Sequence, residues 1–325
     1  MTESRLPAYF PRGGELVYRQ PYEARGARQH VFFLRGNPDA LQATFDRSIG
    51  GPSGGAVSIR PYTSLIALTI VHIDAIRSAD PPDSLIGAGI EEHEVAIWTI
   101  GVDRQRHAPV FFTPYLFVDS GMAMAAGREV FGLPKQDARF TISGDQTPDL
   151  VMMDVLGIDR SAPETPFTWR PVLELRRVGP ASARALAWRT LTEAAHALGA
   201  AIGEGLPHLI EDAELAVKMM AILARGALPV MALKQFRDVA EPDRACYQAI
   251  TEANIQITAL HGGGFLGDYR VTLHDLDSLP IRRDLGLGPD PLTPLAAWWI
   301  EYDFRLESGV ERWNARSPGS GTARA

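Results

Sequence analysis

The sequence predicts a β-rich α+β fold: a closed or nearly closed, mostly antiparallel barrel that carries an inserted helical hairpin. The barrel is predicted by many short runs of alternating apolar and polar residues, with few helical stretches before Val178. The hairpin is predicted by two apolar stripes of helical spacing within Val178–Ala227. We expect one domain over residues 1–310, with the hairpin at 178–227, and a disordered tail over residues 311–325.

The elements follow from apolar periodicity and from the glycine and proline residues that separate the periodic runs. A meandering arm over residues 1–28 comes first. One helix is expected from Asn37 to Ser48, because Pro38 is tolerated in a first helical turn. Two further helices, Ala181–Gly203 and Pro207–Arg225, form the hairpin. The expected strands are Glu15–Tyr18, Gln29–Leu34, Ser64–Ala75, Ile90–Ile100, Ala138–Ser143, Asp149–Gly157, Phe167–Arg176, Leu228–Phe236, Cys246–Thr258, Tyr269–Leu273 and Leu295–Leu306.

Composition excludes several classes of function. The formal net charge is −7 and no basic block occurs, which argues against nucleic acid or an anionic membrane as partner. Cys246 is the single cysteine, so an internal disulfide framework is excluded and a cytoplasmic location is expected. We find neither a signal peptide in Met1–Gly14 nor a run long enough to span a membrane. Acidic residues and histidines do not cluster at metal-ligand spacing, so we expect neither a metal nor a cofactor.

Lysine is rare in this chain and marks a candidate nucleophile. Of 32 basic residues only Lys135, Lys218 and Lys234 are lysines. Lys135 follows Gly132 and Pro134, which punctuate the backbone between two strand-like runs. Unlike arginine, a desolvated lysine can lose its proton and attack a carbonyl group to form an imine. The alternative is a turn lysine that points into water.

The residues around this lysine resemble a known motif. Gly127-Arg128-Glu129, followed by Leu133-Pro134-Lys135, resembles the lysine motif of the acetoacetate decarboxylase family. The resemblance implies a cone-shaped barrel with Lys135 inside, multimers, and imine chemistry on a small keto acid, with decarboxylation of a β-keto acid as the first reading. An aldolase or dehydratase acting on pyruvate-like substrates is the alternative within enzymes. A non-catalytic barrel that binds a small apolar ligand is the rival from another class.

A glutamate is the candidate partner of the lysine. Alternation in Ile90–Ile100 puts Glu92 and Glu94 on one face of the predicted strand and His93 on the other. A glutamate among apolar residues can have a raised pKa and act as acid or base, although acids at a strand start are often solvated. The resemblance implies a site glutamate four residues before an Ala-Ile pair, and Glu92 matches that position. Glu92 would orient the substrate or move protons.

Three further residues are candidates for binding the substrate. An arginine can hold a carboxylate through its bidentate fork. The resemblance implies a site arginine just before the strand Gln29–Leu34, and Arg28 is the nearest match, with Arg25 almost as close. Arg128, within the lysine motif, is the alternative. His93 is the histidine that we expect among the polar groups of the pocket.

Gln136 stands where family decarboxylases carry a second lysine, so we expect burial to activate Lys135 by lowering its pKa. Gly262–Gly267 fits a dinucleotide-binding pattern, but a strand rather than a helix is expected to follow it, so a glycine-rich hairpin is predicted.

The helical hairpin would cover the barrel, close the pocket or build a subunit contact. Together with the apolar strand around Trp298 and Trp299, it predicts a homo-oligomer.

Overall fold

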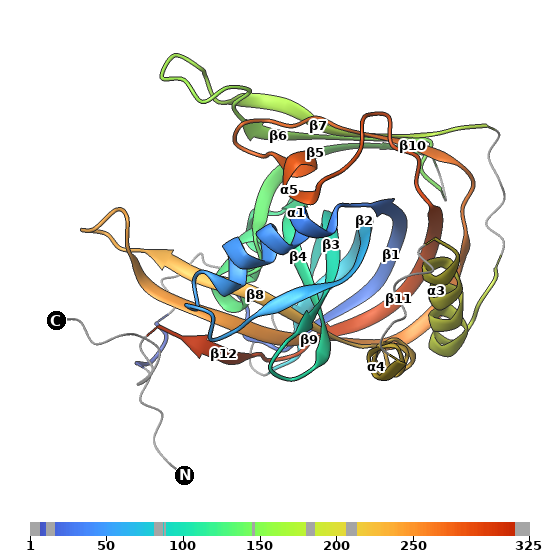
Figure 1. Ribbon diagram of the computed structural model, residues 1–325, viewed down its shortest axis with the longest axis horizontal. Helices are drawn as coiled ribbons and strands as arrows, with labels where there is room; N and C mark the ends of the chain where they lie inside the picture. The colour runs from blue at the N-terminus through green and yellow to red at the C-terminus, as the bar shows by residue number, and fades with distance from the viewer. Residues whose placement is uncertain are drawn as a thin grey trace, which may run out of the picture.

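The computed structural model describes residues 7–10, 17–80, 87, 89–144, 147–179, 186–205 and 213–315, most of which lie in strands (Figure 1). The strands are β1 (Tyr22–Arg35), β2 (Ile59–Ser78), β3 (Ile90–Asp103), β4 (Ala108–Val118), β5 (Lys135–Ser143), β6 (Leu150–Gly157), β7 (Thr168–Arg177), β8 (Ala227–Arg237), β9 (Ala245–Phe265), β10 (Tyr269–Leu273), β11 (Ala296–Leu306) and β12 (Val310–Asn314). The helices are α1 (Pro38–Phe45), α2 (Gly121–Ala126), α3 (Leu191–Gly205), α4 (Ala213–Arg225) and α5 (Ile281–Leu285).

The sheet is mixed and its pairing forms a ring. The strand order is β10-β7-β6-β5-β4-β3-β2-β1-β11-β9-β12, and β8 pairs with both β4 and β9. Pairing therefore runs from β4 through β3, β2, β1, β11, β9 and β8 back to β4. The pairs of β4 with β5 and with β8 are parallel, and a single residue pair, Phe111 with Val230, closes the ring. The β-rich prediction is confirmed, whereas closure at one residue pair is much weaker than in a continuous barrel.

Two layers of strands enclose the main core. Strands β5, β6, β7 and β10 lie across the curved ring as an upper layer, with α1 and α5 at the edge between them (Figure 1). Side chains that alternate inward from both layers meet there, among them Phe32, Leu68, Met153 and Leu173, all of which are fully buried. The opposite face of β1 and β2 remains free to line a cavity inside the ring.

Helix α1 forms as the sequence predicts. The Asn37 side chain accepts hydrogen bonds from the backbone N–H groups of Asp39 and Ala40, and Pro38 occupies the first turn. A π-helical turn, Asp46–Gly50, then ends the element close to the predicted boundary.

The lysine motif differs from its prediction. Residues Gly127–Phe131 continue α2 as a π-helical turn, where the sequence had predicted no helix. Gly132 ends this turn in the left-handed region at φ 78°, a conformation that costs glycine little. Lys135 then begins β5 instead of standing at the end of a turn. The helical turn was missed because its single short apolar run carries no repeat of helical period.

The C-terminal half requires four corrections. Helix α3 begins at Leu191 rather than Ala181, and the predicted connection of the hairpin falls on residues 206–212, outside the described residues. Residues 262–265 of the glycine-rich segment form the end of β9, and β10 pairs with β7, so no hairpin forms there. Val310–Asn314 pairs with β9 as β12, where a disordered tail was predicted. Trp298 and Trp299 are buried within the chain, so they offer no surplus surface to a second subunit.

At the N-terminus, the predicted strand Glu15–Tyr18 falls partly on residues 11–16, outside the described residues, and residues 17–19 are not in a strand.

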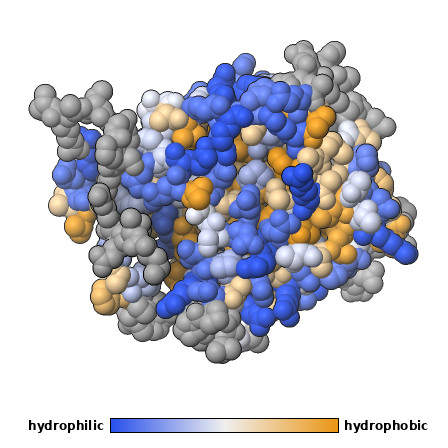
Figure 2. All heavy atoms as spheres, turned by 90° about the horizontal axis from the view of Figure 1, so that it is seen from below, coloured by the Kyte–Doolittle hydropathy of each residue, from blue (hydrophilic) through white to orange (hydrophobic). Residues whose placement is uncertain are grey.

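Figure 2 shows the molecule from below the view of Figure 1. Apolar side chains reach the surface there toward the right, which is the side on which α3 and α4 lie. Among the described residues, no helix combines the length and hydropathy that a membrane span needs.

Candidate active site

A cavity of about 310 Å³ opens inside the ring of strands, on the face of β1 and β2 that points away from the main core. Its walls are mostly apolar, and Lys135, Glu92 and Glu94 are the charged groups that the described part of the chain contributes to them. The other polar lining residues are Tyr18, Tyr22, Gln29, Thr69 and Tyr302. An apolar cavity with a few convergent polar groups is the usual form of a small-molecule site.

Lys135 is held at the start of β5 by contacts along its whole length. Its backbone pairs with β4 beside Leu116, and its carbonyl accepts a hydrogen bond of 3.1 Å from Nη1 of Arg128. Gly127 packs against the side-chain stem, where an added Cβ would lie 2.7 Å from Cδ of Lys135. The π-helical turn thus brings a residue without a side chain to the lysine, which explains why glycine occupies this position.

The amine of Lys135 lies between two carboxylates. Its Nζ is 2.5 Å from Oε1 of Glu92 and 3.4 Å from Oε2 of Glu94. Both glutamates come from the inward face of β3, two residues apart, as the alternation predicts. Lys135 is 8% exposed and Glu92 is 1% exposed. The structure therefore brings together Lys135 and Glu92, the two catalytic residues predicted from the sequence.

The charges of the three groups are coupled. Burial by itself lowers the pKa of Lys135, but the nearby carboxylates of Glu92 and Glu94 outweigh it, so the pKa is raised above its ordinary value. Burial raises the pKa of Glu94 to about 7, against the opposing effect of Lys135. The expectation that burial leaves Lys135 with a lowered pKa is wrong, because the two glutamates reverse the sign. The amine of Lys135 is therefore protonated at neutral pH.

A tyrosine and a glutamine complete the polar part of the cavity. The Tyr302 hydroxyl donates a hydrogen bond of 2.5 Å to Oε1 of Gln29. Burial, with a smaller effect of Glu94, raises the pKa of Tyr302. The phenol therefore stays protonated at neutral pH and is a hydrogen-bond donor within the cavity.

The predicted substrate-binding residues lie elsewhere. Nη2 of Arg28 bonds Oδ1 of Asp74 at 2.7 Å on the opposite face of the sheet, and Arg128 bonds only the backbone of the lysine motif among the contacts that the structure describes. Nδ1 of His93 bonds Oδ2 of Asp119 at 2.8 Å, facing away from Glu92 and Glu94. Among the described residues, no arginine lines the cavity. The structure thus brings neither Arg28 nor His93 to Lys135, and Arg128 contacts its backbone carbonyl rather than its amine.

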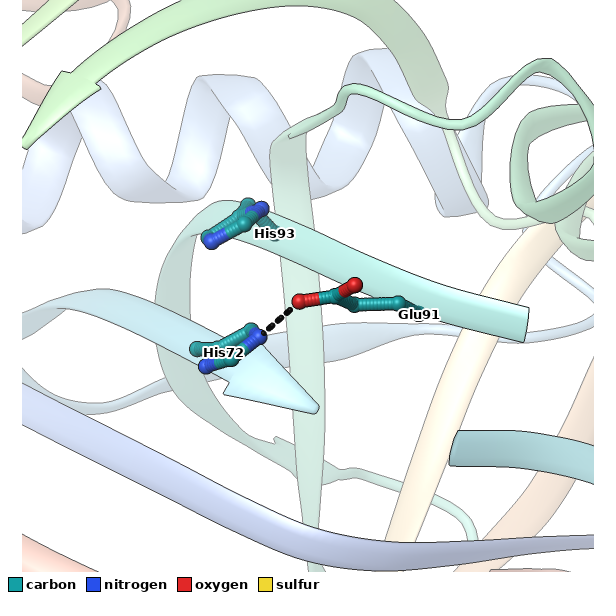
Figure 3. Close-up of side chains that lie close together, drawn as sticks. All are labelled: His72, Glu91 and His93. Atoms are coloured by element: carbon teal, nitrogen blue, oxygen red, sulfur yellow. Dashed lines mark hydrogen bonds and ion pairs between the residues drawn. The ribbon is translucent and has the colours of Figure 1, made fainter. Parts of the chain in front are cut away.

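One group of side chains has the composition of a metal site. His72 on β2, together with Glu91 and His93 on β3, brings three ligand atoms within 4.8 Å of one another (Figure 3). However, the two imidazole rings stack at 7° between their planes with 4.4 Å between centroids, so their lone pairs lie in two separate, nearly parallel planes. Nε2 of His72 bonds Glu91 at 2.6 Å, and Arg28 contacts the other ring nitrogen. The expectation that the protein uses no metal stays a prediction.

Comparison with known proteins identifies one similar family. Residues 71–155 match the sequence model of the family described as Acetoacetate decarboxylase (ADC), and this segment contains Glu92, Glu94 and Lys135. This confirms the resemblance to the acetoacetate decarboxylase-like superfamily. No match is found among curated protein sequences.

Solved structures of acetoacetate decarboxylase-like proteins share the fold over nearly the whole chain. The acetoacetate decarboxylase from Legionella pneumophila is 14% identical with a TM-score of 0.61, and the match covers 97% of this chain and 95% of that one. The enduracididine biosynthesis enzyme MppR, complexed with the condensation product of pyruvate and imidazole 4-carboxaldehyde, is 15% identical with a TM-score of 0.54, covering 94% and 98%. An acetoacetate decarboxylase-like enzyme from Sphingomonas wittichii is 14% identical with a TM-score of 0.53, covering 90% and 92%. At such identities the likeness shows the fold.

Glu94, Gln29 and Tyr302 are among the polar residues of the cavity that sequence reasoning missed. Glu94 shares the face of Glu92, so strict use of the alternation would have included it and left out His93. Gln29 and Tyr302 lie on β1 and β11, which pair only in the folded chain. No local signal in the sequence connects these two residues.

Proposed function

We propose that this protein is an acetoacetate decarboxylase-like enzyme that forms an imine between Lys135 and the carbonyl group of a small-molecule substrate. The observation that carries the proposal is the buried contact of 2.5 Å between Nζ of Lys135 and Oε1 of Glu92, at the wall of an apolar cavity. A nucleophilic amine needs a nearby base, and a structural surface lysine does not. The matched family segment, which contains both residues, supports the same function.

The contacts support a sequence of proton transfers for imine formation. Glu92 accepts a proton from the Lys135 ammonium, and the neutral amine then attacks the carbonyl carbon of the substrate. Glu92 then returns its proton to the carbinolamine oxygen, which leaves as water, so that a positively charged imine forms and Glu92 is again ionised. The carboxylates of Glu92 and Glu94, which flanked the ammonium, then flank this charge and stabilise it.

Decarboxylation of a β-keto acid is the first reaction candidate. In the imine of such an acid, the bond to the carboxylate breaks and its electron pair moves toward the nitrogen, releasing CO₂ and an enamine. A proton then adds to the enamine carbon, and hydrolysis frees the ketone. Glu94 is the side chain suited to that proton transfer, because its pKa of about 7 lets it hold or release a proton near neutral pH.

Aldol-type condensation or dehydration on a pyruvate-like substrate is the second candidate. The acid–base carboxyl of Glu94 beside the amine favours it, because these reactions need a proton removed from the carbon next to the imine. One structural relative, MppR, is complexed with a pyruvate condensation product. Both candidates pass through the same imine. A non-catalytic protein that binds an apolar ligand would form none.

Borohydride trapping tests the proposal. The protein is incubated with acetoacetate or pyruvate, reduced with borohydride, and digested for mass spectrometry. We expect a reduced substrate adduct on Lys135, and CO₂ release from acetoacetate would distinguish decarboxylation from the aldol-type reactions. An unmodified protein with every ketone and keto acid tried would contradict imine chemistry and leave the binding protein as the better reading. The small-molecule substrate, a cytoplasmic location and the lack of a cofactor remain part of this proposal.

A further inference from the structure

We propose that the substrate carries an extended apolar tail, which lies along the cavity between Lys135 and the wall built by Trp188 and the helices α3 and α4. The inference rests on the proposed function, because Lys135 fixes the position of the reacting carbonyl. It adds a substrate class: carbonyl compounds with an uncharged chain of several carbons, rather than acetoacetate or pyruvate themselves.

The volume of the cavity exceeds what a short keto acid fills. It measures about 310 Å³, roughly twice the ~150 Å³ apolar cavity that takes one benzene molecule. Acetoacetate or pyruvate, each close to benzene in size, would therefore leave about half of the space empty. Unfilled apolar space lacks the dispersion contacts that a well-matched ligand supplies.

Strand register shows that the cavity is long. Near the lysine, Glu92 pairs with Ile73 on β2, whereas Trp98 pairs with Ala67 on the same strand, and all four line the cavity. Ile73 and Ala67 are six positions apart, about 20 Å along an extended strand. A volume of this size spread over such a length suits a chain better than a compact group.

The far wall, which Trp188, α3 and α4 build at the end of the cavity away from Lys135, is apolar and firmly packed. Trp188 pairs through its backbone with Gly263, and its ring stands edge to face with Trp298 at 5.3 Å between centroids. Leu191 and Ala195 of α3 and Leu223 of α4 complete this wall. Of the three roles predicted for the helical segment, these contacts favour closing the pocket.

The charges of the cavity are confined to the lysine end. Lys135, Glu92 and Glu94 contact one another, and the described residues of the far wall are apolar or aromatic. A charged tail would lie there without a charged partner among the described residues, at the cost of its lost hydration. The tail that matches this wall is therefore uncharged and apolar.

The test uses the homologous methyl ketones from 2-butanone to 2-nonanone. Trapping by borohydride on Lys135 is measured as a function of ketone concentration for each chain length. We expect the half-saturating concentration to fall by about threefold to fourfold with each added methylene. Equal half-saturating concentrations for short and long ketones would overturn the tail while leaving the proposed imine intact.

A variant of the far wall locates the tail. Ala195→Phe fills space beside α3, so the ratio of half-saturating concentrations between 2-butanone and 2-nonanone should collapse by at least tenfold. Leu223→Trp on α4 makes the same test if Ala195→Phe does not fold. Val217→Phe, at an exposed position of α4, is the control and should keep the wild-type ratio. If Ala195→Phe and Leu223→Trp both keep the wild-type ratio of half-saturating concentrations, the proposed position of the tail is overturned.

Failure of the proposed imine chemistry can be distinguished from failure of the apolar tail. If no ketone is trapped on Lys135, binding of the same ketones to the Lys135→Arg protein is measured by calorimetry. Affinity that rises with chain length in that protein supports the tail without imine chemistry. Affinity independent of chain length, or no binding of 2-nonanone, would overturn the tail as well.

Discussion

The Nζ atom of Lys135 lies 2.5 Å from Oε1 of Glu92, although the two residues come from β5 and β3, which are separated by β4. The parallel pairing of β5 with β4 and the antiparallel pairing of β4 with β3 place both side chains on the inner face. Because both are buried, the charge of one depends on the charge of the other.

Lys135→Arg should abolish imine formation while keeping a cation beside Glu92. Arginine retains its proton and cannot attack a carbonyl, so turnover should fall by several orders of magnitude. A lysine that only anchored a carboxylate would be replaced well by arginine. Turnover and borohydride trapping measure the effect. Lys218→Arg is the control, since Lys218 bonds the carbonyl of His107 and Glu214. A Lys135→Arg protein with a tenth of wild-type turnover, or an adduct on Lys218 or Lys234, would rule the mechanism out.

Glu92→Gln should separate the basicity of Lys135 from its nucleophilicity. Loss of this carboxylate removes a cause that raises the pKa of Lys135, while burial continues to lower it. The pH midpoint of borohydride trapping should therefore move down, and turnover should fall by about 10²–10⁴-fold because a proton acceptor is lost. Glu91→Gln is the matched control, since Glu91 is exposed and bonds His72 on the opposite face. A trapping midpoint that rises or stays fixed would refute the coupling.

Glu94→Gln should change how stability depends on pH. A carboxyl whose pKa is raised by folding binds more protons in the folded state, so the free energy of unfolding falls as pH rises from about 4.5 to 7. Glutamine does not titrate, so the variant should lack this fall. Relative to the variant, wild type should lose on the order of 3 kcal/mol between pH 4 and pH 8. Urea unfolding at several pH values measures it, and parallel pH curves for the two proteins would contradict the raised pKa.

Gly127→Ala should displace the lysine without unfolding the protein. The new Cβ would lie 2.7 Å from Cδ and 3.0 Å from Cε of Lys135, so the flexible stem must move. A shift of about 1 Å at the amine can cost roughly 10²-fold in rate. Gly121→Ala, at the start of the same helical segment, meets no atom within 4 Å and serves as control. Equal trapping rates in the two variants would show that the position of the lysine stem is unimportant.

A homo-oligomer is still expected, but on a different surface from the one predicted. Alternation along β6 leaves Met152 and Leu156 on its outer face, 36% and 53% exposed. Neighbouring exposed apolar side chains often mark a contact surface. Light scattering should give a mass above that of one chain, and Met152→Glu with Leu156→Glu should reduce it. A wild-type mass equal to a single chain at micromolar concentration would disprove the oligomer.

The sequence by itself determined most elements, because the periodicity of apolar residues is a local property. Alternation located β3 and β6, and Asn37-Pro38 located the start of α1. The same alternation already set His93 on the face opposite Glu92. The motif that ends in Lys135 identified the candidate nucleophile, which the matched family segment also contains.

Only the tertiary structure decided which polar groups meet. Arg28 lies next to Gln29 in sequence, but the pleat of β1 sends Gln29 toward the cavity and Arg28 toward Asp74. Lys135 and Glu92 are 43 positions apart, and their contact depends on two strand pairings of opposite sense. The sign of the pKa shift of Lys135 depends on distances to Glu92 and Glu94, which local pattern does not contain. Electrostatic coupling depends on separation in space, and a single sequence records only separation along the chain.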